Sequence, residues 1–258
     1  MIRLAVRVAR EQAELVLAEL AVLAPAGFEE RDAGGLVEYA IYGAPGELPD
    51  LGEVRALVGD ALVEVVTTEV PDDWEERWRQ WHRPLDVGPV RVRPPWEPER
   101  PGALDVVIDP GQAFGTGAHP STRLSLALLL EVPPGGPLAD WGCGSGVLAI
   151  AAARLGYGDV CALDVEPEAV EATRRNSVAN GVDVEVRLGD ALEVELPAAG
   201  LAVANIARAS VEELAPRLRC RVLVASGYLE DDRIDLGGWS HRERRVAEGW
   251  AADVFKRR

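Results

Sequence analysis

The stretch Asp140-Trp141-Gly142-Cys143-Gly144-Ser145-Gly146 decides the fold of this chain. It follows the short apolar run Leu138-Ala139 and precedes a run of helical character that starts at Val147. Glycines at a strand-to-helix turn let the backbone bend sharply and let a ligand lie against bare peptide. Asp164 ends the next apolar run, 22 residues after Gly142, where a carboxylate can accept hydrogen bonds from ribose hydroxyls. The pattern predicts a site for a nucleoside cofactor.

The spacing of the glycines indicates which nucleoside. A dinucleotide fingerprint, G-x-G-x-x-G, requires a glycine where this chain has Val147. Asp140 would repel a pyrophosphate, whereas it could pair with an ammonium group. An ammonium-bearing amino acid joined to ribose and adenine describes S-adenosylmethionine. The sequence therefore favours a methyl-donor site over a nicotinamide site, and the alternative without a ligand is a tight turn with a chance acidic residue.

Composition limits the class of protein. The 258 residues suit one large domain or two smaller ones, and 48% hydrophobic residues suffice for a packed core. The three cysteines form no CxxC pair and the three histidines lie far apart, so we expect neither a disulfide framework nor a metal site. No apolar run is long enough for a membrane span and no signal peptide is evident. We therefore expect a cytoplasmic protein.

The formal net charge of −16 disfavours nucleic-acid binding, because phosphate contacts require a positive surface. The same charge would attract a basic protein substrate. Solubility alone is the simpler explanation of the charge.

Residues 1–70 predict a small separate domain. Strands are expected at 2–8, 27–31, 36–42 and 62–70, with helices at 11–23 and 51–58. The order β-α-β-β-α-β is that of a ferredoxin-like α+β sandwich. No catalytic cluster occurs in it, so we expect it to dock a partner or to cover the core.

Residues 71–103 are expected to connect this domain to a second one at 104–258. A polar helix is predicted at 72–81, with Trp74, Trp78 and Trp81 on one face. This face is expected to pack at the joint between domains, and stacking on nucleobases is the alternative. Six prolines between residues 84 and 101 surround a predicted short strand at 90–93.

Strands and helices alternate from residue 138 onward. Strands are expected at 138–141, 160–164, 184–188, 201–205 and 221–225, helices at 147–155, 167–179 and about 210–218, and an antiparallel pair at 241–248 and 250–256. This order predicts an α/β fold with a doubly wound, mostly parallel sheet and a crevice at the strand carboxyl ends. Asp140, Asp164 and Asn205 all fall at those ends.

A second motif spans residues 109–122, D-P-G-Q-A-F-G-T-G-A-H-P-S-T. It precedes an apolar helix, and helix capping explains Ser121 or Thr122. Capping does not explain Phe114, Thr116 and His119 among glycines, a mixture suited to covering a ligand.

The two motifs together resemble those of the ribosomal protein L11 methyltransferases, and the resemblance extends over residues 72–227. It implies a seven-stranded class I methyltransferase (Rossmann-like) domain behind a small domain that recognises the ribosomal protein. It also implies trimethylation of lysine side chains and of the N-terminal α-amine by S-adenosylmethionine.

The resemblance also implies roles for individual residues. Asp140, Gly142 and Gly144 would hold the methionine end of the cofactor, and Asp164 the ribose. Asp190 and Ala191 would lie beside adenine, and Phe114, Thr116 and His119 would close over the cofactor. Asn205 would face the substrate amine with its side chain and nearby backbone carbonyls.

Methyl transfer requires a neutral amine. Presenting a lysine of pKa ~10.4 in its neutral form at pH 7 costs about 4.6 kcal/mol, and an α-amine costs much less. No strong base is evident near residues 201–205, so we expect the proton to pass to water. His119 as a general base is the alternative to His119 as a hydrogen-bonding loop residue.

Two features depart from the family pattern: Trp141 and Cys143 within the glycine loop, and a short charged segment at 229–239 where a helix is expected. The second feature leaves the structure of the far edge of the sheet undecided. Other functions also remain open: an N-methyltransferase for another protein or a small-molecule amine, or a ribosome-associated binding module without turnover.

Overall fold

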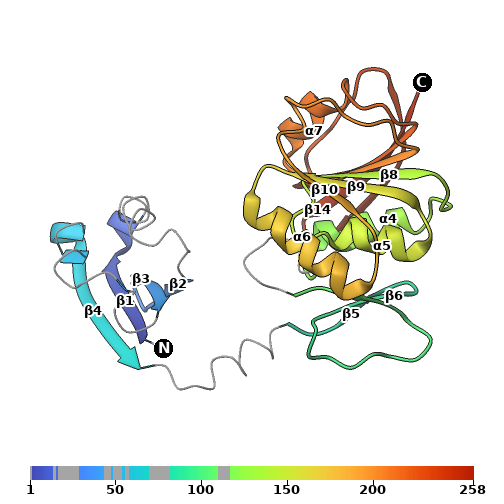
Figure 1. The fold of residues 1–258 in the computed structure, drawn as a ribbon. Coiled ribbons are helices and arrows are strands. Elements are labelled where there is room, and N and C mark those ends of the chain that lie inside the picture. Colours follow the sequence, from blue (N-terminus) through green and yellow to red (C-terminus); the bar gives the residue numbers. More distant parts are fainter. Residues whose placement is uncertain are drawn as a thin grey trace. The chain divides into compact units, whose positions relative to one another are not determined.

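The computed structural model describes residues 2–13, 16, 29–43, 48, 54–55, 58–69, 82–109 and 117–258. The chain forms two compact units, Met1–Trp81 and His82–Arg258. Both are drawn in Figure 1. No helix in the described ranges has the length and apolarity needed to cross a membrane.

The first unit is built on a four-stranded antiparallel sheet. Its strands, in spatial order, are β2 (Glu29–Asp32), β3 (Leu36–Gly43), β1 (Ile2–Ala9) and β4 (Leu62–Glu69). β3 lies between β1 and β2, and β1 lies between β3 and β4, which is the interleaved arrangement of two split β-α-β units. This order confirms the strand arrangement of the ferredoxin-like layout expected from the sequence.

The two helices predicted in this unit lie mostly outside the described residues. Four residues from those segments, Ala13, Val16, Val54 and Val58, are nevertheless buried in one core with strand residues such as Val6. The apolar face of the sheet is therefore covered from both segments.

The second unit begins with a three-stranded sheet of β5 (Leu85–Val87), β6 (Val90–Arg93) and β7 (Leu104–Val107). β6 pairs antiparallel with β5 and parallel with β7. Arg93 Nε donates to Asp105 Oδ2 at 2.7 Å, and both side chains are buried. Much of the expected connection is thus folded onto the second unit. The tryptophan helix predicted at 72–81 lies outside the described residues.

The main sheet of the second unit has seven strands. Their spatial order is β10 (Glu185–Leu188), β9 (Gly158–Asp164), β8 (Pro137–Trp141), β11 (Leu201–Asn205), β12 (Val222–Leu229), β14 (Trp250–Arg257) and β13 (Trp239–Ala247). The first five are parallel, and β14 is antiparallel to both of its neighbours. This confirms the doubly wound sheet and the terminal antiparallel pair. The chain winds outward in both directions from the β8–β11 pair, where a ligand crevice is expected.

Helices cover both faces of this sheet. Figure 1 shows α4 (Pro120–Leu129), α5 (Val147–Leu155) and α6 (Pro167–Asn180) on one side and α7 (Arg208–Leu214) on the other. α5 begins after Gly146 and ends before Gly156, both in the left-handed conformation that favours glycine. α6 has Pro167 in its first turn and Gly181 as its left-handed stop.

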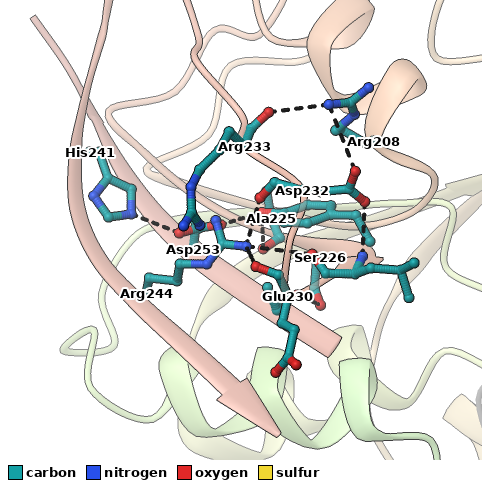
Figure 2. Close-up of polar contacts among 12 residues, drawn as sticks. Arg208, Ala225, Ser226, Glu230, Asp232, Arg233, His241, Arg244 and Asp253 are labelled. Atoms are coloured by element: carbon teal, nitrogen blue, oxygen red, sulfur yellow. Dashed lines mark hydrogen bonds and ion pairs between the residues drawn. The ribbon is translucent and has the colours of Figure 1, made fainter. Parts of the chain in front are cut away.

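The connection between β12 and β13 is a turn held by side chains rather than a helix. Arg244 Nη2 donates to the carbonyl oxygens of Glu230 at 2.9 Å and Asp232 at 2.8 Å. The Asp232 carboxylate in turn accepts from the Leu229 amide at 3.0 Å. Figure 2 shows these contacts. The short charged segment therefore connects β12 to β13 without the helix that the family pattern led us to expect.

Arg244 is anchored by a carboxylate inside the sheet. Asp253 on β14 is fully buried, and its Oδ2 lies 3.5 Å from Arg244 Nη1. The same oxygen accepts from the Tyr228 hydroxyl at 2.8 Å, and Oδ1 lies 2.7 Å from His241 Nε2 (Figure 2). The three contacts satisfy the buried charge, as a buried carboxylate requires.

Candidate functional site

A cavity of about 420 Å³ opens at the carboxyl ends of β8, β9 and β11. Its volume falls in the range of small-ligand sites. Residues of all three strand ends line it, among them Gly142, Asp164 and Asn205. The structure therefore brings Gly142, Asp164 and Asn205 together at one cavity.

Asp164 forms the wall at the end of β9. Its Oδ2 accepts from the Gly144 amide at 2.8 Å, and its Oδ1 accepts from the Glu166 amide at 3.0 Å. Each carboxylate oxygen has further acceptor capacity. Because two amides fix the carboxylate, it is oriented before any ligand arrives, as a ribose diol would require.

The glycine loop needs bare Cα atoms for two close contacts. A Cβ on Gly142 would lie 2.3 Å from Ile206 Cγ2, and a Cβ on Gly146 would lie 2.7 Å from Thr173 Cγ2. Gly142 and Gly146 also have positive φ angles of 77° and 82°. A side chain at either position would thus clash and strain the backbone.

Asp140 lies behind this loop and not on the cavity wall. It is almost completely buried, and its Oδ2 accepts from the Ala149 amide at 3.1 Å, which caps the first turn of α5. Its Oδ1 is buried without a partner among the described residues. Burial, with a smaller contribution from the charge of Asp164, raises the pKa of Asp140 to about 7. Its expected contact with the methionine end stays a prediction.

The turn after β10 forms another part of the wall. Asp190 and Ala191 line the cavity, and Asp190 Oδ1 accepts from the Leu192 amide at 2.8 Å. Ala191 and Leu192 add apolar surface there. This combination suits a flat heteroaromatic ring with polar edges.

Asn205, the last residue of β11, is tied to the start of α4. Its Nδ2 donates to Thr122 Oγ1 at 3.2 Å, while its Oδ1 is buried with no partner among the described residues. A residue of the cavity wall thus carries an amide oxygen without a donor among the described residues. Buried acceptors without partners are rare in folded proteins and call for an explanation.

His119 caps α4 instead of lining the cavity. Its Nδ1 accepts from the Ser121 amide at 3.3 Å and lies 2.7 Å from Ser121 Oγ, and its ring meets Trp250 edge-on with centroids 4.5 Å apart. Burial and the nearby positive charge of Arg123 lower the pKa of His119. Its roles as a base or in closing over the cofactor stay predictions. Phe114 and Thr116 lie outside the described residues.

Several cavity residues were not singled out from the sequence: Trp141, Val165, Leu192, Ile206, Ser210 and Leu214. Trp141 ends a predicted strand, and Val165 and Ile206 directly follow one, so that position was the one signal available for these three. Thr122 was interpreted only as a cap, because its contact with Asn205 joins residues far apart in sequence.

The site fits S-adenosylmethionine. The oriented carboxylate of Asp164 suits the ribose, the Ala191–Leu192 wall suits adenine, and the unpartnered Oδ1 of Asn205 suits an amine beside the methyl group. In the described ranges no group of three or more His, Cys, Asp or Glu side chains is placed to hold a metal ion.

Comparison with known proteins identifies the family. The sequence model described as ribosomal protein L11 methyltransferase (PrmA) matches residues 51–257. A ribosomal protein L11 methyltransferase of Burkholderia ambifaria is 32% identical over 99% of this chain and 97% of its own length. The chain belongs to the ribosomal protein L11 methyltransferase family. Membership confirms the class I methyltransferase fold, S-adenosylmethionine as cofactor and methyl transfer as the class of reaction.

Other family members match over shorter stretches. The relative from Symbiobacterium thermophilum is 42% identical over 61% of this chain, and the match spans about half (53%) of that relative's length. The relative from Pelotomaculum thermopropionicum is 42% identical over 77% of this chain and 70% of its own length. A crystal structure of a ribosomal protein L11 methylase from Lactobacillus delbrueckii subsp. bulgaricus superposes with a TM-score of 0.60 and 26% identity, covering 69% of this chain and all of that chain.

Proposed function

We propose that this chain transfers methyl groups from S-adenosylmethionine to lysine side chains and to the N-terminal α-amine of ribosomal protein L11. The observation that carries the proposal is the unpartnered Oδ1 of Asn205 at the cavity of an L11-methyltransferase family member. This oxygen can accept an N–H bond from a substrate amine and so direct the nitrogen lone pair into the site.

The bound cofactor would supply an electrophilic methyl group on a sulfonium, which a neutral amine nitrogen can take up while sulfur keeps the electron pair of the broken C–S bond. A protonated lysine must first lose its proton, which passes to water. Asn205 then stabilises the positive charge that develops on nitrogen through its amide oxygen.

This route does not require His119 as a base. Its Nδ1 is already used in capping α4, so proton transfer through this nitrogen would compete with the cap. A general-base role for His119 would appear as a large loss of turnover in His119→Asn at pH 7, with partial recovery at higher pH.

We propose residues 1–70 as the substrate-recognition domain and residues 82–258, which form one compact unit, as the methyltransferase domain. The connection expected at 71–103 is thereby reduced to residues 71–81. The net charge of −16 favours encounter with a basic ribosomal protein, and no direct contact with nucleic acid is required. We also propose the cytoplasm as the site of action. The three cysteines support this proposal, because all are buried and unbonded, as is usual in a reducing compartment.

The test is mass spectrometry of purified L11 after incubation with this enzyme and S-adenosylmethionine. Gains of about 14 Da per methyl group, mapped to lysines or to the N-terminal amine, would support the proposal. Asn205→Ala is the informative variant, since it should reduce turnover about 100-fold or more while cofactor affinity changes little. No gain on L11 in the presence of confirmed cofactor binding would reject this substrate and point to another amine.

A further inference from the structure

Ile206, the residue after Asn205, is held between two glycines from different parts of the sheet. On one side its Cγ2 occupies the place of a Cβ on Gly142, at 2.3 Å. On the other side its backbone lies against Gly227, where a Cβ would be 2.3 Å from the Ile206 carbonyl oxygen and 2.7 Å from its carbonyl carbon. Ile206 also lines the cavity. One residue therefore contacts both the cofactor loop and the neighbouring strand β12.

Gly227 lies at an irregularity of β12. The pairing with β14 shifts register between Ser226 and Tyr228, and Gly227 has a φ of 97°. The Ile206 amide donates to the Ser226 carbonyl at 3.0 Å, which brings the two backbones together at this point.

The chain on both sides of Gly227 is fixed. Ser226 Oγ donates to the Ala251 carbonyl at 2.7 Å, and the Tyr228 hydroxyl donates to the buried Asp253 at 2.8 Å (Figure 2). Arg244 holds the turn that follows. A side chain at position 227 would therefore displace Ile206 rather than β12.

We propose that Gly227 is a positioning residue for methyl transfer. It leaves room for the Ile206 backbone beside β12, and so keeps the preceding residue, Asn205, with its unpartnered Oδ1, in place to receive the substrate amine. The inference rests on the proposed function, because it assigns a residue that holds Asn205 in position for that reaction. A displacement of roughly 1 Å at such a position can reduce turnover about 100-fold.

Gly156 provides a matched control. It has a φ of 94°, close to that of Gly227, yet a Cβ there would meet nothing within 4 Å. Gly156→Ala thus places an alanine at a similar positive φ without the clash against Ile206. A difference between the two variants then reports chiefly the contact with Ile206.

The experiment compares the affinities of two cofactor analogues for the full chain by calorimetry. S-adenosylhomocysteine lacks a group at the methyl position, whereas the amine analogue carries C–NH3+ in place of the methylated sulfonium. We expect the unmodified chain and Gly156→Ala to prefer the amine analogue about 10-fold, since hydrogen bonds to a charged group are strong. Gly227→Ala should lose this preference, keep its affinity for S-adenosylhomocysteine and lose about 100-fold in turnover on L11.

Two results would overturn the inference: no preference for the amine analogue in the unmodified chain, or equal losses in Gly156→Ala and Gly227→Ala. If Gly227→Ala loses S-adenosylhomocysteine binding altogether, Gly227→Ala with Arg244→Met is measured. Release of the turn should restore binding and part of the preference, and failure to do so counts against the inference. Loss of the analogue preference in Gly227→Ala, without any methylation of L11 by the unmodified chain, would reject L11 as substrate while supporting the role of Gly227.

Discussion

The side chains of Asn205 and Thr122, 83 residues apart, are joined by a hydrogen bond of 3.2 Å from Nδ2 to Oγ1. The bond engages Nδ2, while Oδ1 has no donor among the described residues. Without it the amide could rotate about its last torsion, which is broad for asparagine.

Thr122→Val should therefore reduce turnover about 3- to 10-fold, the worth of one neutral hydrogen bond. Thr122→Ser keeps the hydroxyl and serves as the control, with turnover close to that of the unmodified chain. Steady-state kinetics on L11 measure both. Equal losses in the two variants would show that the methyl group of Thr122, and not its hydroxyl, matters at this position.

Asp164→Ala should weaken S-adenosylmethionine binding about 10- to 100-fold. The carboxylate is expected to accept hydrogen bonds from the ribose, and bonds to a charged acceptor are worth about 1.5–3 kcal/mol. Calorimetric titration of the cofactor measures the change. The exposed carboxylate of Asp183 provides the control, since Asp183→Ala should leave the affinity unchanged. Unaltered affinity in Asp164→Ala would remove this residue from the ribose site.

Asp140 should make the protein less stable as the pH rises from about 4 to about 7. Burial raises its pKa to about 7 in the folded chain, whereas an unfolded Asp titrates near 3.9. The folded state thus holds the proton more tightly between these values, and its contribution to stability is full below pH 4 and is lost as the pH passes 7.

Asp140→Asn removes this titration. Its free energy of unfolding, relative to that of the unmodified chain, should rise with pH by up to about 1.4 kcal/mol per pH unit within this window. Urea unfolding at pH 5, 6 and 7 gives the comparison. Parallel pH curves for the two proteins would mean that Asp140 ionises normally.

Arg244→Met should lower the melting temperature and loosen the turn after β12. The substitution removes a cation beside the fully buried Asp253 and the donor to two carbonyls of the turn. A cost of about 2 kcal/mol is expected, below that of a fully broken buried pair, because Tyr228 and His241 still contact the carboxylate. Arg242→Met, an exposed change on the same strand, should have little effect in the same thermal melts.

The sequence predicted the strand ends of the main sheet because each ends in a local signal. Glycines follow β8, and single polar residues, Asp164 and Asn205, end β9 and β11. The antiparallel pair at the end of the chain was equally predictable from the sequence, because Gly249 separates two strand-like runs.

The remaining features depend on contacts that no local pattern encodes. Examples are the cap that Asp140 provides for α5, the hydrogen bond between Asn205 and Thr122, and the contacts of Ile206 with two glycines. Each joins segments that meet only in the folded chain. The sheet within the proline-rich connection was missed for the same reason, because β6 pairs with β5 on one side and with β7, beyond the expected connection, on the other. A turn held by Arg244 replaces the expected helix. Arg244 is in turn held by the carboxylate of Asp253, which lies on the next strand of the chain, β14.

The antiparallel course of β14 has a consequence for an enzyme that acts on amines. Lys256 is the one lysine in the sequence, and it pairs with Val222, the first residue of β12. It therefore lies at the amino edge of the parallel strands, whereas the cavity opens at their carboxyl edge. The enzyme's own side-chain amine is out of reach of its own site, so any methyl group found on Lys256 would have been delivered by another molecule.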